Sequence, residues 1–266
     1  MLENEIVIRK IVKSAVESYA AGFERRHVQE FDDPNGTINM KIHNVFISAL
    51  GQEIQYYSAL VRSLDSSLGN MLERLAVNIA ELFYTVSRNV EGPLLPEQTQ
   101  IIAELLESYK SRKKVPLASD YAKLRSGNRA TSQHKRHDSD YYLIDEETGA
   151  HYLIELKIGG DLDNKKARSE KEAVLEQFAI LSNTLPQNTD INICFATAYN
   201  RFGEGKPWKQ ERVRQFFAAD ELLIGQDFWN FICKMPNGYE IVLDEYQKHA
   251  SVILNSLDKI KKIYLQ

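Results

Sequence analysis

Residues 135–160, KRHDSDYYLIDEETGAHYLIELKIGG, decide the fold that this sequence predicts. Two runs rich in aromatic and β-branched residues, 141–144 and 152–157, favour strands on either side of a turn cluster. Gly149 in that cluster can take the positive φ that a tight turn requires. The stretch therefore predicts a β-hairpin, and the apolar residues of its second run indicate a strand that lies inside a sheet.

The position of the turn decides which residues of the two strands face each other. A turn near residues 147 and 148 pairs residues whose numbers sum to about 295. This register places Asp140 opposite Glu155. It also places Asp138 opposite Lys157. Because alternate residues of a strand share a face, Glu155 and Lys157 lie on one side, and we expect the acids and the lysine to gather there.

Carboxylates gathered in a sheet are costly unless something compensates their charge, and a divalent cation is one such compensation. Oxygen ligands from Asp and Glu suit Mg²⁺, which also takes phosphate oxygens. We therefore expect Asp140 and Glu155 to bind Mg²⁺, with Asp138 as a further residue of the metal site. Lys157 beside the metal can stabilise charge on a phosphate or orient a water, which favours phosphodiester hydrolysis. The alternative is a solvated strand face, where Glu-x-Lys is common.

This arrangement resembles the PD-(D/E)xK nuclease motif, with Asp140 for its Asp and residues 155–157 for its ExK. Ser139 stands where the motif has proline, and that proline bears no chemistry. Whether Asp138 or Asp140 is the motif Asp stays open. We prefer Asp140, because it directly precedes the hydrophobic strand.

Length and composition limit the protein class. The chain has 266 residues, which suits one large domain or two small ones, and it has no apolar stretch of about 18 residues that would predict a transmembrane helix. The N-terminus lacks a signal-peptide pattern. Cys194 and Cys233 are too far apart for a zinc knuckle, and they indicate a cytoplasmic protein. A net charge of −4 means that DNA binding must rest on local basic patches.

The first 111 residues carry mainly helical periodicity. Segments 4–26, 43–63, 69–87 and 97–111 place apolar residues at helical spacing. Glu73 lies beside the apolar stripe of the third segment, near its expected first turn. It is either an acid that stabilises the helix dipole or a fourth acid of the metal site. Many PD-(D/E)xK nucleases have such a helical Glu before the hairpin.

The segment 112–137 is strongly basic, with eight Lys or Arg against one acid. It is either a solvated loop or an approach for a phosphate backbone, and we favour phosphate contact because it leads into the acid-rich hairpin. The residues expected to contact DNA there are Lys113, Lys114, Arg125 and Arg129.

After the hairpin, a helix over about 165–183 and a strand over 191–198 complete the order strand, strand, helix, strand of the common nuclease core. Lys171 is one of several cations in the first half of that helix, where they oppose the dipole and indicate another use. The loop from Tyr199 to Trp208 and the basic residues after it suit base reading. Its expected DNA-binding residues are Asn200, Arg201, Lys206, Lys209 and Arg212. The alternative is an ordinary surface loop.

Several strings over residues 46–232 together resemble the TdeIII family of type II restriction endonucleases. They are SSLGNMLE (66–73), DSD (138–140), IELK (154–157), DNKKA (163–167), YN (199–200) and IGQDFW (224–229). The resemblance implies Mg²⁺-dependent cleavage of double-stranded DNA at a short palindromic site, usually by a homodimer. It also implies a GGNCC-type target.

We therefore predict an α/β fold with a restriction-endonuclease-like PD-(D/E)xK core, in which helices flank a mixed central sheet and the N-terminal and C-terminal parts are helical. Residues 1–266 are interpreted as one endonuclease domain. Its parts are a helical lead (1–111), the basic segment (112–137), a catalytic and recognition core (138–232) and a C-terminal helix (233–266).

Two rival functions remain for this sequence. A repair or junction-resolving nuclease of the same fold would not cut plain duplex at one defined sequence. A DNA-binding protein whose acids are structural would bind DNA without cleaving it in Mg²⁺.

Overall fold

The computed structural model describes residues 2–125 and 133–265, with backbone alone at residues 133 and 137–140. The described chain folds into two compact units. The chain up to Asn78 and the chain from Glu240 onward form the helical unit, and Ile79–Tyr239 form the sheet unit. No described helix is long and apolar enough to cross a membrane. That the two units act as one endonuclease domain stays a prediction.

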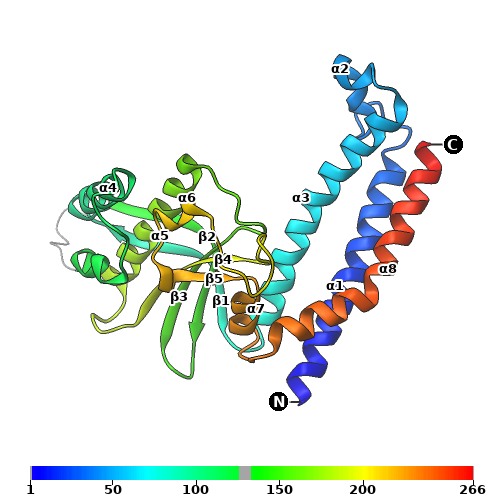
Figure 1. Ribbon diagram of the computed structural model, residues 1–266. Helices are drawn as coiled ribbons and strands as arrows, with labels where there is room; N and C mark the ends of the chain where they lie inside the picture. The colour runs from blue at the N-terminus through cyan, green and yellow to red at the C-terminus, as the bar shows by residue number, and fades with distance from the viewer. Residues whose placement is uncertain (1, 126–132, 266) are drawn as a thin grey trace. The chain divides into compact units, whose positions relative to one another are not determined.

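The helical unit contains α1 (Leu2–Gln29), most of α3 (Gln52–Ala80) and most of α8 (Gly238–Tyr264), together with the short helices η1 (Asn39–His43) and α2 (Val45–Ser48). α1 and α8 run in the same direction (Figure 1). Polar contacts join the two helices at two separate places.

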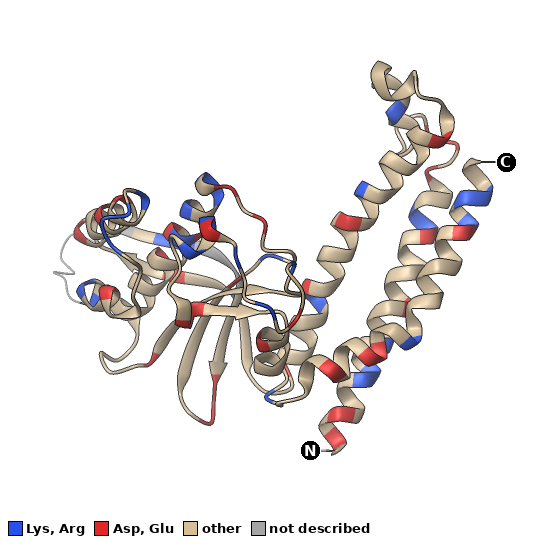
Figure 2. Cartoon of the chain, in the orientation of Figure 1, with Lys and Arg blue, Asp and Glu red and all other residues tan. Residues whose placement is uncertain are grey.

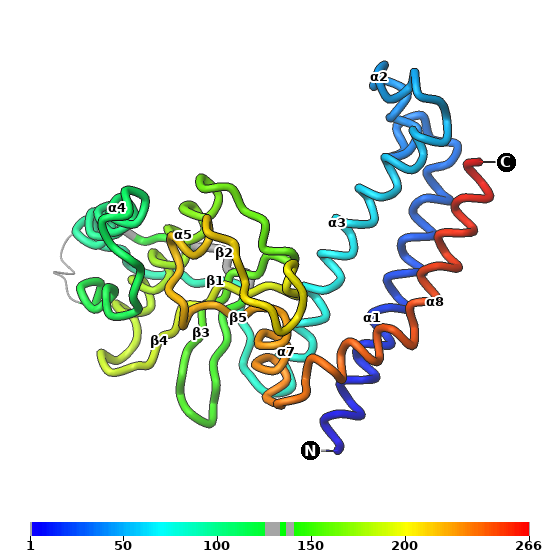
Figure 3. The backbone as a smooth tube through the Cα atoms, in the orientation of Figure 1, coloured from blue at the N-terminus to red at the C-terminus, as the bar shows by residue number. Residues whose placement is uncertain are grey.

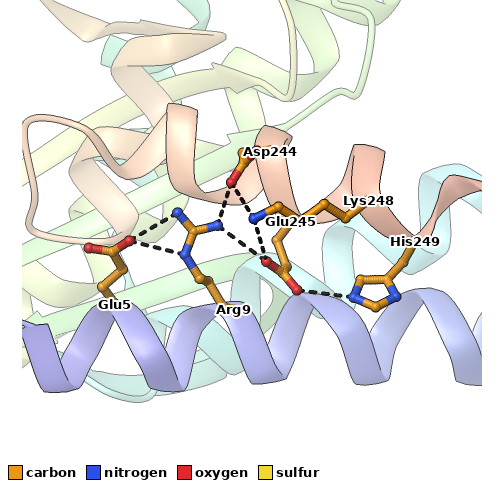
Figure 4. Close-up of polar contacts among 6 residues, drawn as sticks. All are labelled: Glu5, Arg9, Asp244, Glu245, Lys248 and His249. Atoms are coloured by element: carbon orange, nitrogen blue, oxygen red, sulfur yellow. Dashed lines mark hydrogen bonds and ion pairs between the residues drawn. The ribbon is translucent and has the colours of Figure 1, made fainter.

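Near one end of this helix pair, Arg9 of α1 contacts Asp244 at 2.6 Å and Glu245 at 3.2 Å (Figure 4). Near the other end, Ser256 donates a hydrogen bond to Glu24 at 2.9 Å. The apolar sides of the helices bury residues such as Ile8, which is completely enclosed. Burial of this apolar surface is the main source of stability for the helical unit.

The boundaries of α3 differ from the sequence prediction. Segments 43–63 and 69–87 were expected to be separate helices, but α3 runs unbroken from Gln52 to Ala80. Ser67 takes part in the helix by donating its hydroxyl to the carbonyl of Ser63 at 2.7 Å, four residues back. The Ser67 side chain therefore bonds within a continuing helix.

The end of the predicted third helix is also wrong. Residues 85–87 belong to β1 (Thr85–Leu94) and not to a helix. β1 pairs with the hairpin strand, so that Thr85 lies opposite Ile144. This long-range pairing, which no local pattern reveals, overrides the helical spacing that ends at Val86.

The sheet unit is built on a five-stranded mixed sheet of order β1-β2-β3-β4-β5 (Figure 1). β2 (Gln133–Asp145) pairs antiparallel with β1 and with β3 (Ala150–Leu156). β4 (Ile191–Thr197) pairs parallel with β3 and with β5 (Leu222–Ile224). The predicted mixed α/β sheet is confirmed, and the hairpin lies within it.

Helices cover both faces of this sheet. On one face, α5 (Asn164–Thr184) packs with α4 (Pro96–Lys110) and η2 (Ala118–Arg125) over a core that includes Leu153 and Phe178. On the other face, Phe231 of α7 (Gln226–Ile232) packs against Tyr152, with ring centroids 4.9 Å apart. β3 is therefore enclosed between two strands and two layers of helix.

The pairing of the hairpin strands follows the predicted register. Tyr141 lies opposite Ile154, and Asp145 lies opposite Ala150, so the numbers of paired residues sum to 295. Gly149 takes φ of 71° in the turn. Figure 3 shows the backbone of the two strands and of the turn between them.

The other side of β2 is irregular. Ser87 of β1 pairs with Tyr142, but Asn89, two residues later, pairs with Asp138, four residues earlier in β2. Residues 139–141 therefore face a single residue of β1. Such bulges bend a strand and are frequent beside active sites.

A buried ion pair anchors α5 in this unit. The Lys171 ammonium is fully enclosed and lies 2.7 Å from a carboxylate oxygen of Glu221. Tyr121 donates its hydroxyl to Glu221 at 2.6 Å, and the Ala218 amide donates at 2.7 Å. The other use that the sequence indicated for Lys171 is this structural contact.

Candidate active site

Glu155 lies near the end of β3, a largely buried strand, and Lys157 lies just beyond that end. Glu155 pairs with Phe195 of β4 and is 7% exposed. Lys157 directly follows β3, and its amide donates to the Ala196 carbonyl at 3.0 Å, so the ladder continues past the strand end. The backbone of both residues is thus fixed by neighbouring strands, which is how a sheet positions a reactive pair.

The Lys157 ammonium lies among carboxylates. It forms an ion pair with Glu155, and it lies 3.4 Å from a carboxylate oxygen of Glu170 on α5. The Lys157 side chain is 32% exposed, so a substrate phosphate can reach it. The expected pairing of a buried acid with a lysine on one strand face is present.

Sequence reasoning missed Glu170. It lies in the stretch 164–172, NKKARSEKE, where charged residues alternate without a spacing that singles one out. Its contact with Lys157 depends on where α5 crosses the sheet, and only the tertiary fold shows this.

The predicted acids of the first hairpin strand are described only by their backbone. Asp138 and Asp140 lie in β2, and their side chains are outside the described part of the structure. The described ladder between β2 and β3 ends where Tyr141 pairs with Ile154, and the predicted register would place Asp140 opposite Glu155 at the next step. The bulge opposite β1 includes position 140.

The donors of the site suit a hard cation. Carboxylate oxygens are the ligands that Mg²⁺ prefers, and Glu155 supplies a buried one. Among the side chains that the structure describes, no group of three or more His, Cys, Asp and Glu is arranged to hold a metal ion. The predicted metal ligands therefore stay a prediction.

Glu73 lies on α3 in the helical unit and is half-buried. Because α3 starts at Gln52, Glu73 is far from the first turn, and the idea that it stabilises the helix dipole there is wrong. Its part in the metal site stays a prediction.

The residues of the basic segment have different surroundings. Lys114 forms an ion pair with Asp120. Burial raises the pKa of Asp120, but hydrogen bonds from Lys114 and Tyr109 outweigh this effect and lower it. Arg125 donates to the carbonyls of Gln187 and Thr189.

These contacts show that Lys114 and Arg125 already have structural partners. Lys113 is exposed, and Arg129 lies outside the described residues. The Lys and Arg residues that the structure describes are blue in Figure 2. Lys113 is therefore the best placed of the predicted phosphate contacts.

The loop after β4 is organised by Asn200. Its amide nitrogen donates to the Lys206 carbonyl at 2.7 Å, and its oxygen accepts from the Phe202 amide at 3.0 Å. Both ends of the side chain that was expected to read a base therefore hold the loop together. Arg201 is exposed and lies 2.8 Å from Asp161.

The same loop packs against the chain that follows Lys157. A Cβ atom at Gly159 would lie 2.7 Å from the Tyr199 hydroxyl, so a larger residue at this position would displace the Tyr199 side chain. The basic residues that follow Tyr199 in the chain are exposed; they are Lys206, Lys209 and Arg212. The structure thus brings the predicted reading loop next to the candidate active site.

Comparison with known proteins identifies one family. The family model described as type II restriction endonuclease, HinfI, matches residues 4–250. No curated protein and no solved structure matches the chain. The match confirms the predicted class of enzyme, and it names HinfI and not TdeIII as the family.

Proposed function

Since the chain belongs to the HinfI family of type II restriction endonucleases, and is thus a site-specific deoxyribonuclease, we propose that it hydrolyses double-stranded DNA at a short palindromic sequence in a Mg²⁺-dependent reaction. The observation that carries this proposal is the pair formed by the buried Glu155 and Lys157 at the end of β3. The family favours restriction over the two rivals, a repair nuclease and a non-catalytic DNA-binding protein.

We assign the site to the PD-(D/E)xK class, with Asp140 and Glu155 as metal ligands. Bound Mg²⁺ supplies Lewis-acid stabilisation of the charge that develops on the scissile phosphate. Asp138 and Glu73 are proposed to hold a second metal or its waters.

Lys157 acts on the attacking water and the phosphate. Its ammonium is held beside Glu155, so it can donate a hydrogen bond to a phosphate oxygen and orient the water that attacks. A charged donor that is fixed before the substrate arrives stabilises the transition state without reorganisation. The water oxygen forms a new bond to phosphorus, the bond between phosphorus and one sugar oxygen breaks, and that oxygen leaves as a hydroxyl with a proton that comes from the water.

Two sets of contacts are proposed for DNA. The basic segment binds phosphates through Lys113, Lys114, Arg125 and Arg129. These contacts position the protein on the duplex and do not read its sequence. Bases are read by the loop that contains Asn200 and Arg201, with Lys206, Lys209 and Arg212 beside it. Because the Asn200 side chain is engaged within the loop, Arg201 is the stronger candidate reader.

A homodimer is proposed to cut the palindrome. A two-fold symmetric site suits two copies related by the same symmetry. Support comes from the apolar segment, residues 40–54, whose large side chains are exposed: Met40, Ile42, Val45, Phe46, Leu50 and Ile54, with Phe46 at 83%. Large exposed apolar patches on soluble proteins often mark interaction surfaces, and the exposed side chains of this segment therefore favour a contact between copies. The free, buried cysteines agree with the proposed cytoplasmic location.

The test is digestion of plasmid DNA by the purified protein, with Mg²⁺ or with a chelator, followed by sequencing of the ends. We expect discrete fragments in Mg²⁺ whose ends share one palindromic sequence. The GGNCC-type target rests on the TdeIII resemblance alone, and the sequenced ends decide it. Random ends, or no cleavage, would contradict the proposed function.

A further inference from the structure

Lys157 contacts acids from two different elements. Glu155 precedes it by two residues on the same strand, whereas Glu170 approaches from α5. The 3.4 Å separation from Glu170 is longer than a charge-assisted hydrogen bond of about 2.8 Å, so this is an ion pair with room for movement.

Glu155 has two roles that compete. Under the proposed function its carboxylate binds the metal, and the same carboxylate holds the Lys157 ammonium. A lysine on a flexible four-carbon stem loses orientation when a carboxylate that anchors it is withdrawn. Glu170 provides a second anchor that does not belong to the metal site proposed above.

The backbone beneath Glu170 is firmly fixed. The next residue, Lys171, is fully buried, and its ammonium lies 2.7 and 2.9 Å from the two carboxylate oxygens of Glu221. One turn further along, Val174 packs in the core of the sheet unit. The position of Glu170 over the end of β3 is therefore set by buried contacts, and its own side chain remains half-exposed at the site.

We propose that Glu170 is a positioning residue that keeps the Lys157 ammonium directed at the scissile phosphate when Glu155 binds metal. The inference rests on the proposed function. Glu170 acts through Lys157 and is not itself a metal ligand.

The experiment compares Glu170→Gln and Glu170→Asp with Glu172→Gln, a matched control that is exposed on the same helix. Single-turnover cleavage, its Mg²⁺ dependence and duplex affinity in Ca²⁺ are measured for each protein. For Glu170→Gln we expect the cleavage rate to fall at least about tenfold. Duplex affinity and the Mg²⁺ concentration for half-maximal rate should stay within about twofold. Glu170→Asp should recover part of the rate, and Glu172→Gln should cleave like the parent.

A second measurement does not depend on activity. Melting temperatures without metal are compared for Glu170→Gln, Lys157→Met and the double variant. If the ion pair exists, the fall in melting temperature of the double variant is smaller than the sum of the falls in the two single variants. Additive losses would overturn the contact.

The outcomes separate the inference from the proposed function. A parent protein that cuts no DNA defeats the proposed function and the inference together. A parent that cuts while Glu170→Gln cuts equally fast defeats the inference alone. A raised Mg²⁺ requirement in Glu170→Gln would make Glu170 a metal ligand and would also overturn the positioning role.

Discussion

At the scale of single residues, Lys157 differs from the other basic residues proposed to act on DNA. It is partly enclosed and held by carboxylates, whereas Lys113, Lys206 and Lys209 are exposed. Exposed lysines bind phosphate through charge alone and leave its position loose. A lysine with a fixed direction is suited to chemistry.

Lys157→Ala is expected to abolish cleavage and to leave the fold and most of the DNA affinity intact. The reason is that the ammonium acts on the reacting phosphate, which is one of many phosphates that the protein binds. Plasmid cleavage in Mg²⁺ and duplex binding in Ca²⁺ measure the two effects. A variant that still cuts within about tenfold of the parent, a loss under ~1.4 kcal/mol, would show that the site is wrongly assigned.

Arg201 is expected to read the target sequence. Its exposed guanidinium pairs with Asp161 in the free protein and would exchange this partner for a base edge. Arg201→Ala should cost about 1–3 kcal/mol of binding on the cognate duplex alone. By contrast, Lys113→Ala should weaken binding to all duplexes. It should also reduce the slope of log affinity against log salt concentration by about one, as expected for one lost phosphate contact.

Affinities in Ca²⁺ for cognate and scrambled duplexes, at several salt concentrations, separate these two effects. Equal weakening of both duplexes by Arg201→Ala would mean that the bases are read elsewhere.

His27 is expected to make stability depend on pH. Burial, with the nearby Arg26 charge, lowers the pKa of His27 below its ordinary value of 6.5. The unfolded chain therefore takes up this proton at a higher pH than the folded chain does. The stability that the neutral, buried His27 contributes is complete above about pH 6.5. It is lost as the pH falls towards the lower pKa of His27 in the folded protein.

Urea unfolding at pH 8 and pH 5.5 tests this sign. His27→Gln should lose stability at pH 8 and show a smaller decrease between the two pH values than the parent. The exposed His43 gives the matched control, His43→Gln, which should behave like the parent. An unchanged pH dependence in His27→Gln would contradict the expectation.

At the scale of elements, the hairpin could be predicted because its determinants are local. A short turn with Gly149 sets the register, and the register decides which residues of β2 and β3 are level. The pairing of Glu155 with Lys157 also needs only their spacing in one strand. These parts of the site require no knowledge of the rest of the chain.

The parts that could not be predicted depend on distant contacts. β1 pairs with residues about fifty positions away, and no local pattern in 85–94 indicates this partner. Glu170 meets Lys157 only because α5 crosses the sheet at one place. The break expected between segments 43–63 and 69–87 is absent, since α3 is continuous there and the Ser67 hydroxyl bonds inside it.

The attachment of α5 gives a prediction at this scale. Lys171→Met should destabilise the protein by about 3–5 kcal/mol, because it leaves the buried Glu221 carboxylate without its cation. The double variant, Lys171→Met with Glu221→Gln, should lose much less free energy of unfolding than the sum of the losses in the two single variants. Urea denaturation of the three variants measures this coupling, and additive losses would show that the pair does not act as a unit.

At the scale of the whole molecule, the chain starts and ends in the helical unit, and Ile79–Tyr239 are inserted between its two parts. The proposed catalytic pair, Glu155 and Lys157, belongs to the inserted sheet unit, and the apolar segment belongs to the helical unit. Catalysis and association are therefore proposed for different units of one chain.

Phe46→Asp is expected to shift the protein from dimer to monomer, because it places a charge in the apolar segment proposed as the contact between copies. Leu254→Asp is the matched control, since Leu254 is also exposed in the helical unit but lies outside the segment. Sedimentation equilibrium over a range of concentrations measures the association. A monomeric parent would defeat the proposed homodimer, and a dimeric Phe46→Asp would exclude this segment as the contact.

The enclosed pair of Lys171 and Glu221 also limits how such a sequence can diverge. A single substitution on either side leaves an unmatched charge, and the penalty is a large part of the total stability of a typical domain. Descendants that replace the pair must therefore change both positions nearly together or first acquire stabilising changes elsewhere. Recombination that brings α5 from one relative and residues 218–221 from another would separate the partners, so these two segments should be inherited as a block.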